Sequence, residues 1–193
     1  STTYTLSFWY NLDIVGYYQE LFTADNNLQV YFRPRGTEVG LEMANNGALR
    51  LQQLSPYSSI NSWVHACISV DTAGTSTMFI NGNSVDSSTT IPQTTGISNP
   101  VIGSFNGSSL YVNGLVDEVA IFNTALSAPD VSTLRGGASA GSVGVPADIS
   151  SLNPVGWWRM GDGTEAGSGT TVYDMSSNSN NGTLTNGPTY STD

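Results

Sequence analysis

The sequence GLVDEVAIFNTALS occupies residues 114–127 and combines the features of a strand with those of a helix start. Leu115 to Phe122 is rich in apolar and β-branched residues, and the Asn113-Gly114 pair before it is typical of a two-residue hairpin turn. Ser127 is a candidate N-cap because its hydroxyl can accept a bond from the first helical turn. This stretch therefore predicts a closing strand followed by one short helix near 127–135.

Short apolar runs separated by turn residues fill the chain before this stretch. Tyr4 to Tyr10 alternates between the two faces of a strand, and Asn45-Asn46-Gly47 and Asn81-Gly82 are hairpin signals. Runs at a spacing of about 8–12 residues predict an all-β fold, a two-sheet antiparallel sandwich of the jelly-roll type. The expected strands are 4–10, 28–32, 39–43, 48–54, 63–70, 77–80, 100–103, 109–112 and 115–122.

Composition divides the chain into three parts. Residues 1–136 hold the expected sandwich, and residues 137–147 are glycine, serine and alanine without a period, which predicts a linker. Residues 148–193 carry one apolar cluster around Trp157 and Trp158, too little for a core of their own. We therefore expect this last part either to complete the sandwich or to open a following repeat.

The charge composition excludes two classes of partner. Charged residues make up 10% of the 193 residues, the formal net charge is -10, and all five basic residues are arginines. Nucleic-acid binding needs a basic patch, and no apolar run reaches the about 18 residues of a membrane span. The aromatic content of 10% argues against disorder. Neutral polar residues instead indicate an extracellular or virion-surface domain.

Four motifs stand in order along residues 4–135: TLSFWY at 5–10, WVHA at 63–66, FING at 79–82 and the 114–127 stretch. Together they resemble the laminin G-like, concanavalin A-like lectin-glucanase superfamily, including its pentraxin-related branch. The resemblance implies a two-sheet sandwich with a curved concave face in proteins that bind glycans or other proteins, often with calcium. Some distant relatives on this fold are glycosidases or lyases.

The C-terminal part resembles the opening of the same family's domain, in the segments 155–158, 169–174 and 178–184. Opening elements that follow closing ones indicate a piece of a tandem array or a circular permutation. The WWRMGD sequence at 157–162 and the STD ending at 191–193 also resemble repeats in large structural proteins of marine tailed phages.

Catalytic signals are weak. A glycosidase needs two carboxylates about 5–9 Å apart, but Asp117 and Glu118 are adjacent and should face opposite sides of a strand. Glu38 and Glu42 would lie about 13 Å apart along one strand face. His65 is the only histidine and lacks a G-x-S-x-G partner motif, so we expect a packed strand histidine. We therefore predict that the chain is not an enzyme.

Calcium is the metal that the sequence favours, because calcium binds carboxylate, amide and carbonyl oxygens. Asp162 and the loop that begins at Asp174 offer such oxygens. Asp117 matches, by the resemblance, an aspartate that holds a structural calcium in fold relatives. The predicted ligands are Asp117, Asp162 and Asp174, and the alternative is that these carboxylates only cap turns.

Aromatic rings in loops and at strand ends are candidates for sugar binding, because the faces of pyranose rings stack on them. The candidates are Tyr17, Tyr18, Tyr57, Tyr111 and Trp158. We predict a non-catalytic carbohydrate- or ligand-binding module of a larger extracellular or virion-surface protein. Its expected partner is a glycan, or a cell-surface or virion protein.

Two alternatives stay open at this stage. One is a purely structural spacer or decoration domain of a phage tail fibre or capsid, which would self-associate in a tandem or oligomeric assembly. The other is a polysaccharide hydrolase or lyase.

Overall fold

The computed structural model describes residues 3–24, 27–35, 38–54, 60–89, 97–160 and 167–191. The first strands are β1 (Tyr4–Leu12), β2 (Gln19–Ala24), β3 (Leu28–Arg35), β4 (Glu38–Asn45), β5 (Ala48–Leu54), β6 (Val64–Val70), β7 (Ser76–Ile80) and β8 (Asn83–Ser88). The later elements are β9 (Val101–Ile102), β10 (Gly114–Phe122), α1 (Ala128–Thr133), the 3-10 helix Ser150–Leu152, β11 (Gly156–Trp158), β12 (Gly167–Ser168), β13 (Thr171–Val172) and β14 (Gly182–Thr183).

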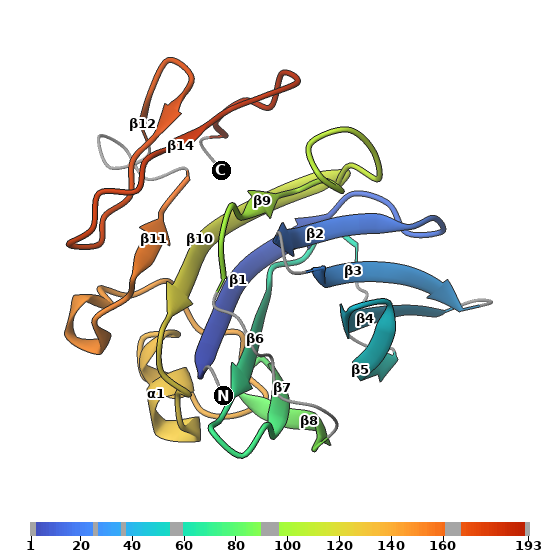
Figure 1. Cartoon of the computed structure of the whole chain (residues 1–193), viewed down its shortest axis with the longest axis vertical. Helices are drawn as coiled ribbons and strands as arrows, with labels where there is room; N and C mark the ends of the chain where they lie inside the picture. The colour runs from blue at the N-terminus through green and yellow to red at the C-terminus, as the bar shows by residue number, and fades with distance from the viewer. Residues whose placement is uncertain are drawn as a thin grey trace.

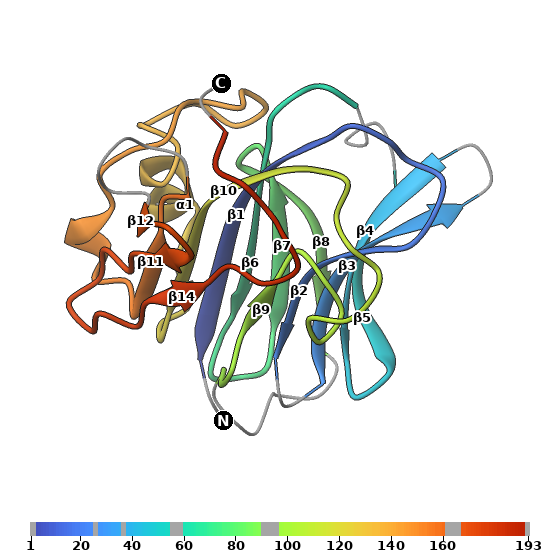
Figure 2. The same ribbon diagram turned by 90° about the horizontal axis from the view of Figure 1, so that it is seen from above.

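Two antiparallel sheets lie face to face and form the expected all-β sandwich (Figures 1 and 2). A six-stranded sheet has the order β11-β10-β1-β6-β7-β8, and a five-stranded sheet has the order β5-β4-β3-β2-β9. A small three-stranded sheet, β12-β13-β14, belongs to the C-terminal segment. Helix α1 is the short helix predicted near 127–135, and Ser127 caps it as expected. Among the described residues, no helix is long and apolar enough to cross a membrane.

The main core lies between the two large sheets. Alternate residues of β1, from Tyr4 to Tyr10, are buried there, as the alternation of the sequence predicts. The Phe8 ring lies 5.7 Å from the Phe22 ring, and Tyr10 meets Phe32 edge-on at 4.8 Å, centroid to centroid. These aromatic pairs from facing sheets hold the sandwich together by burying large apolar surfaces.

A second core covers the outer face of the six-stranded sheet, where α1 packs against it. Phe79, Phe122, Val131 and Trp157 are among its members. The sheet is thus buried on both faces at this place. Trp157 belongs to this second core and Trp158 to the main core, and the two are only 5% and 6% exposed.

The residues that follow α1 are held by one arginine. The buried Arg135 guanidinium donates to the backbone oxygens of Ala138, Ser139 and Ser142, and it packs directly over Gly82. Gly82 has a φ of +77°, and a Cβ at this position would collide with the guanidinium. Residues 137–147, expected as a linker, therefore include a loop that is anchored beside the Asn81-Gly82 turn between β7 and β8.

The C-terminal segment adds β11 to the edge of β10. A bulge in the pairing of β10 with β1 gives Glu118 a φ of +48° and directs its carboxylate towards that segment. One carboxylate oxygen accepts from Trp157 Nε1 at 2.6 Å, and the other accepts from Arg159 Nε at 2.8 Å. A buried carboxylate thus depends on two partners that residues 148–193 supply.

Within residues 1–136 the expected strands differ from the structure in three places. They do not include β2 or β8; β2 carries a bulge between Glu20 and Phe22, which interrupts its alternation. The expected strand 109–112 is wrong. Leu110 has a φ of +53°, which an extended strand does not allow, so these residues form a loop instead.

We expect a chain that ends at Gly137 to lose cooperative unfolding, or to melt more than about 10 °C lower than the full chain. The truncation removes Trp157, Trp158 and Arg159, so it opens both cores and leaves the Glu118 carboxylate without these partners. Circular dichroism melts and the binding of a hydrophobic dye measure the effect. An unchanged melting midpoint would show that the segment contributes nothing to this sandwich.

Candidate ligand-binding groove

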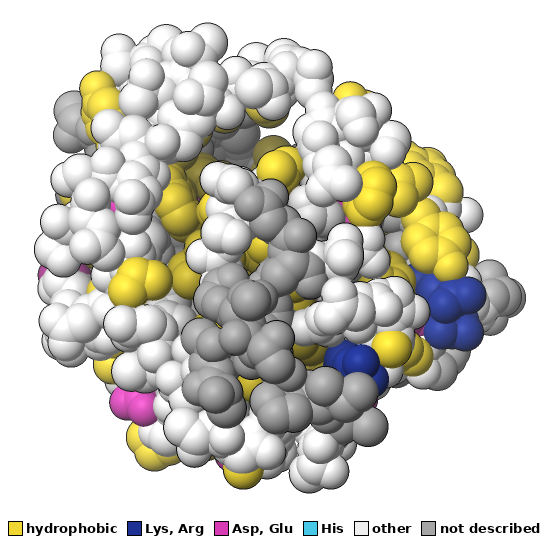
Figure 3. Space-filling view, viewed as in Figure 1, with side chains coloured by type: hydrophobic (Ala, Val, Ile, Leu, Met, Phe, Trp, Pro, Cys, Tyr) yellow, Lys and Arg dark blue, Asp and Glu magenta, His cyan; other side chains and the backbone are white. Residues whose placement is uncertain are grey.

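A groove of about 1390 Å³ lies between β9 and β10 on one side and the C-terminal segment on the other. The space-filling view shows the surface hollowed between that segment and the main body (Figure 3). The floor consists of partly buried apolar side chains that pack on the main core. They are Ile97, Ile102, Val112, Val116, Val155, Met160, Leu184 and Tyr190.

The polar side chains of the groove are almost all neutral. Asp117 is the one carboxylate among the described lining residues, and none of those residues is basic. Neutral amides and hydroxyls can donate to and accept from the hydroxyl groups of an uncharged ligand. The neutral polar lining residues are Ser98, Asn99, Ser104, Asn178, Asn180, Asn181, Thr183, Thr185, Asn186, Thr189 and Ser191.

Side-chain amides attach the C-terminal wall of the groove to the sandwich. Asn178 and Asn180 both donate from Nδ2 to the backbone oxygen of Val155, at 2.9 and 3.2 Å. Asn186 Nδ2 donates to the backbone oxygen of Gly107 at 2.6 Å, across the mouth of the groove. The C-terminal wall is therefore held to the sandwich by hydrogen bonds as well as by the chain connection.

The structure brings together some of the aromatic residues that the sequence suggested. Tyr111 and Trp158 both line the groove; Tyr111 is 47% exposed, whereas Trp158 forms part of the floor and donates from Nε1 to the backbone oxygen of Asn180 at 3.0 Å. Tyr17 and Tyr18 lie outside the groove lining: the Tyr17 hydroxyl accepts from Asn113 Nδ2 at 3.2 Å, and the Tyr18 ring lies beside Tyr31 of the five-stranded sheet. Tyr57 falls outside the described residues.

Two further aromatic residues, Trp63 and Tyr190, line the groove without having been predicted. Trp63 belongs to the strand motif at 63–66, which carries no signal for a ligand. Tyr190 stands in a glycine- and serine-rich tail, and nothing in the sequence shows that this tail returns to β9 and β10. Its hydroxyl donates to the backbone oxygen of Thr171 at 2.8 Å, which fixes the ring.

The loop that carries Tyr111 is held by β2. Gly103 N donates to the Leu21 oxygen at 2.9 Å, and Glu20 N donates to the Leu110 oxygen at 2.7 Å. Val112 N then closes the loop on the Gly103 oxygen at 2.9 Å. These backbone bonds place the Tyr111 ring at the rim of the groove.

The Glu20 side chain lies buried on the strand that holds this loop. It is 3% exposed, and its Oε1 has no hydrogen-bond partner among the described residues. Burial raises the pKa of Glu20 to about 8, because the charged form is poorly solvated there. The folded chain therefore binds the Glu20 proton more tightly than the unfolded chain does.

We expect this carboxyl to destabilise the fold progressively as the pH rises from 4.5, its ordinary pKa, to about 8. Glu20→Gln removes the titration, so the free energy of unfolding of the variant should rise relative to the parent across that interval. Denaturant unfolding at several pH values measures the difference. A difference that stays constant with pH would contradict a buried, protonated carboxyl.

The structure describes two of the three predicted metal ligands, Asp117 and Asp174. Asp117 lines the groove and accepts from Glu118 N at 2.8 Å. Asp174 accepts four hydrogen bonds, from Trp157 N, Ser176 N, Ser176 Oγ and Asn180 N, all within 2.8 Å. Asp162 lies outside the described residues. Over the described ranges no group of three His, Cys, Asp or Glu residues could hold a metal. These four hydrogen bonds use all the acceptor positions of the Asp174 carboxylate within the fold.

We expect Asp174→Asn to cost about 2 kcal/mol of unfolding free energy, because an amide nitrogen cannot accept the bonds that one carboxylate oxygen accepts. The loss should be equal in excess calcium and in excess chelator, measured by thermal melts. If calcium instead raises the melting midpoint of the parent but not that of the variant, Asp174 is a calcium ligand.

Residues 1–132 match the laminin G family model described as the concanavalin A-like lectin/glucanases superfamily. The chain belongs to this superfamily. The match spans β1 to α1, and so contains the strands that form both large sheets, apart from β11. A search of curated proteins finds no match.

A solved structure shows the same fold over almost the whole chain, and two others match less closely. A Bacteroides ovatus protein to which carbohydrate binding has been attributed is 18% identical, with a TM-score of 0.70 over 94% of this chain and 51% of that one. Domain 4 of an extracellular GH43 arabinanase from Geobacillus stearothermophilus, solved with arabinotriose, is 24% identical over 66% and 63%, TM-score 0.49. The botulinum neurotoxin serotype D binding domain is 14% identical over 67% and 36%, TM-score 0.49. The chain spans about half the length of the first of these proteins.

The superfamily name covers both lectins and glucanases. Because a glucanase needs two carboxylates at its site, the positions of the carboxylates around the groove matter. Glu118, next to Asp117, turns away from the groove to Trp157 and Arg159, and leaves the described groove lining without a second carboxylate. The Ser7–His65 pair, 2.9 Å apart, is fully buried. Burial first, and the nearby Arg135 second, lower the pKa of His65 to about 3. His65 is thus a neutral packed histidine, as the sequence predicted.

Proposed function

We propose that this chain is a non-catalytic module that binds a neutral polysaccharide in the groove. The observation that carries the proposal is the groove lining: neutral hydrogen-bonding side chains above an apolar floor, with Asp117 as the one described carboxylate. Retaining and inverting glycosidases both need two such groups. A site built in this way recognises its ligand by contact and leaves glycosidic bonds intact.

The rim and the C-terminal wall of the groove would make different contacts with the ligand. The half-exposed Tyr111 ring offers an apolar face to a sugar, and the asparagines of the C-terminal wall offer amides to its hydroxyl groups. The groove holds no basic residue among those described, so a ligand without charge fits it best.

The proposal places the module in a larger extracellular or virion-surface protein, with a glycan or a surface protein as partner. The low charge content and the polar neutral surface support this setting. The pentraxin-related branch, a tailed-phage origin, a tandem array and a bound calcium stay predictions from the sequence motifs. A purely structural spacer is the rival, and it would bind only neighbouring copies of itself.

We expect Tyr111→Ala to weaken binding to a neutral polysaccharide about tenfold, because the variant loses an aromatic contact face. Tyr18→Ala is the matched control: Tyr18 is 41% exposed, close to the 47% of Tyr111, but lies outside the groove. A panel of arabinan, xylan, galactan and β-glucan, screened by affinity electrophoresis and then by calorimetry, provides the ligand.

Two results would reject the proposal. One is an absence of binding to every neutral glycan together with self-association in analytical ultracentrifugation, which favours the spacer. The other is an equal loss in the Tyr111 and Tyr18 variants, which removes the groove as the binding site.

A further inference from the structure

Three of the five arginines lie on the five-stranded sheet, and the other two stabilise contacts elsewhere in the fold. Arg135 binds backbone oxygens and Arg159 pairs with Glu118. The remaining three, Arg33, Arg35 and Arg50, lie on β3 and β5 of the five-stranded sheet. Figure 3 shows basic side chains in two separate patches on the right half of the view, the larger of them next to hydrophobic side chains. A chain with a net charge of -10 and no lysine therefore concentrates its available positive charge on a single face.

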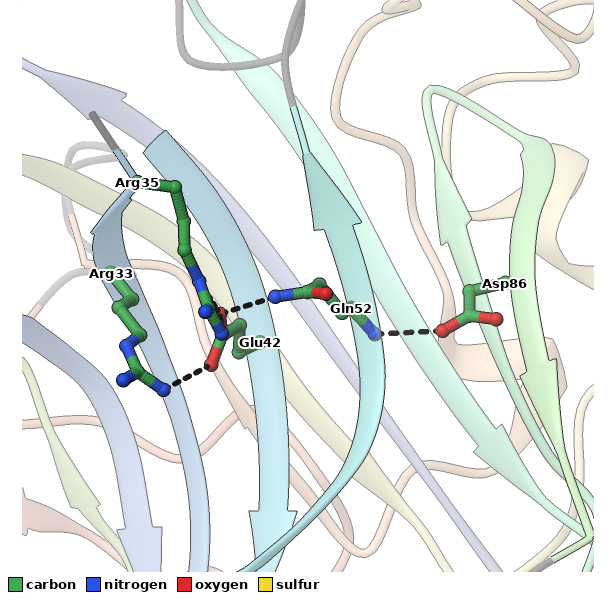
Figure 4. Close-up of polar contacts among 5 residues, drawn as sticks. All are labelled: Arg33, Arg35, Glu42, Gln52 and Asp86. Carbon is green, nitrogen blue, oxygen red and sulfur yellow. Dashed lines mark hydrogen bonds and ion pairs between the residues drawn. The ribbon is translucent and has the colours of Figure 1, made fainter. Parts of the chain in front are cut away.

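A buried glutamate organises this charge. Glu42 on β4 is fully buried, and its Oε1 accepts from Arg35 Nε at 3.0 Å, Arg35 Nη2 at 2.6 Å and Gln52 Nε2 at 2.6 Å (Figure 4). Arg33 Nη1 lies 3.7 Å from the other oxygen. One carboxylate thus faces two guanidinium groups, and the described group keeps a positive charge in excess.

Figure 4 also draws Asp86, which lies on the far side of β5 from this group. Asp86 Oδ2 accepts from the backbone N of Gln52 at 2.7 Å. Asp86 therefore satisfies the edge of the sheet and does not neutralise Arg33.

Arg35 donates hydrogen bonds to Glu42, whereas the N–H groups of Arg33 are not used in this way. Its guanidinium lies 5.4 Å from the centroid of the Tyr18 ring, its side chain is 37% exposed, and it donates no hydrogen bond within the described part of the chain. The ion pair and the ring contact hold the group in place. A fixed guanidinium with unused N–H donors suits the bidentate binding of a carboxylate.

Aromatic rings lie directly beside these donors. The Tyr18 and Tyr31 rings have centroids 6.0 Å apart, and Tyr18 is half-exposed. Burial first, and then the Glu42 charge and a hydrogen bond with it, raise the pKa of Tyr31 to about 12, so its hydroxyl stays protonated. A ligand here meets a cation and aromatic surface together, which suits a sugar ring that carries its own carboxylate.

We propose that Arg33, with Tyr18 and Tyr31, forms a second carbohydrate site that binds a uronic acid unit of an acidic polysaccharide. Arg33 donates to the uronate carboxylate, and the tyrosines contact the sugar ring. The site goes beyond the neutral groove proposed above and shares none of its described lining residues.

The test is a titration of the full ¹⁵N-labelled chain with tri-galacturonate, followed by the arginine Nε–H signals. The chain has five arginines, so the Arg33 signal can be assigned by substitution. We expect the Arg33 signal to shift, no shift with a neutral trisaccharide, and binding at least about tenfold weaker in Arg33→Gln. Arg33→Lys, which keeps the charge but loses the fork, should bind between the two.

Arg50→Gln is the matched control, because it removes one positive charge from the same sheet but no contact with Tyr18. An equal loss in Arg33→Gln and Arg50→Gln would overturn the site in favour of diffuse attraction. So would binding of dextran sulfate without tri-galacturonate, or no shift of the Arg33 signal.

Two variants keep the test independent of folding and of the groove. Tyr18→Ala leaves the Glu42 ion pairs intact, and it should also weaken tri-galacturonate binding while its melting midpoint stays near that of the parent. Tyr111→Ala should leave tri-galacturonate binding unchanged. If Tyr111→Ala abolishes it, the acidic sugar binds in the groove and the second site is rejected.

Discussion

The burial of the Glu118 carboxylate is the constraint on which the groove depends. A charge at this depth is tolerated only with good partners, and the described ones, Trp157 and Arg159, both come from the C-terminal segment. The bulge that turns Glu118 outward also separates it from Asp117, which remains in the groove. One local irregularity of β10 thus docks the segment, provides the groove with its second wall, and leaves a single described carboxylate inside.

Much of the sandwich could be predicted because its signals are local. The alternation from Tyr4 to Tyr10, the Asn81-Gly82 turn and the Ser127 cap depend on neighbours in the sequence, and the structure has all three. The burial of both Trp157 and Trp158 could not be predicted in this way. It requires cores on both faces of one sheet, and the second core is built from residues far apart in the chain.

In the candidate sites, too, features with a local sequence signal could be predicted, and features that depend on distant residues could not. Loop position and residue type pointed to Tyr111 and Asp117, which do lie in the groove, but the same criteria also selected Tyr17, which does not. Asp174 has the residue type of a metal ligand, yet backbone donors that only the folded loop assembles occupy it. The role of Arg33 depends on Glu42 and Tyr18, and their approach across the sheet has no sequence signature.

The bond from Gln52 to Asp86 has a consequence for assembly. Edge strands with unpaired N–H groups recruit strands from other molecules, and proteins displayed in many copies are especially exposed to this hazard. Here a carboxylate from β8, the edge of one sheet, occupies an N–H of β5, the edge of the other. One donor of the β5 edge is thereby used within the molecule and is no longer free to pair with a strand of another chain.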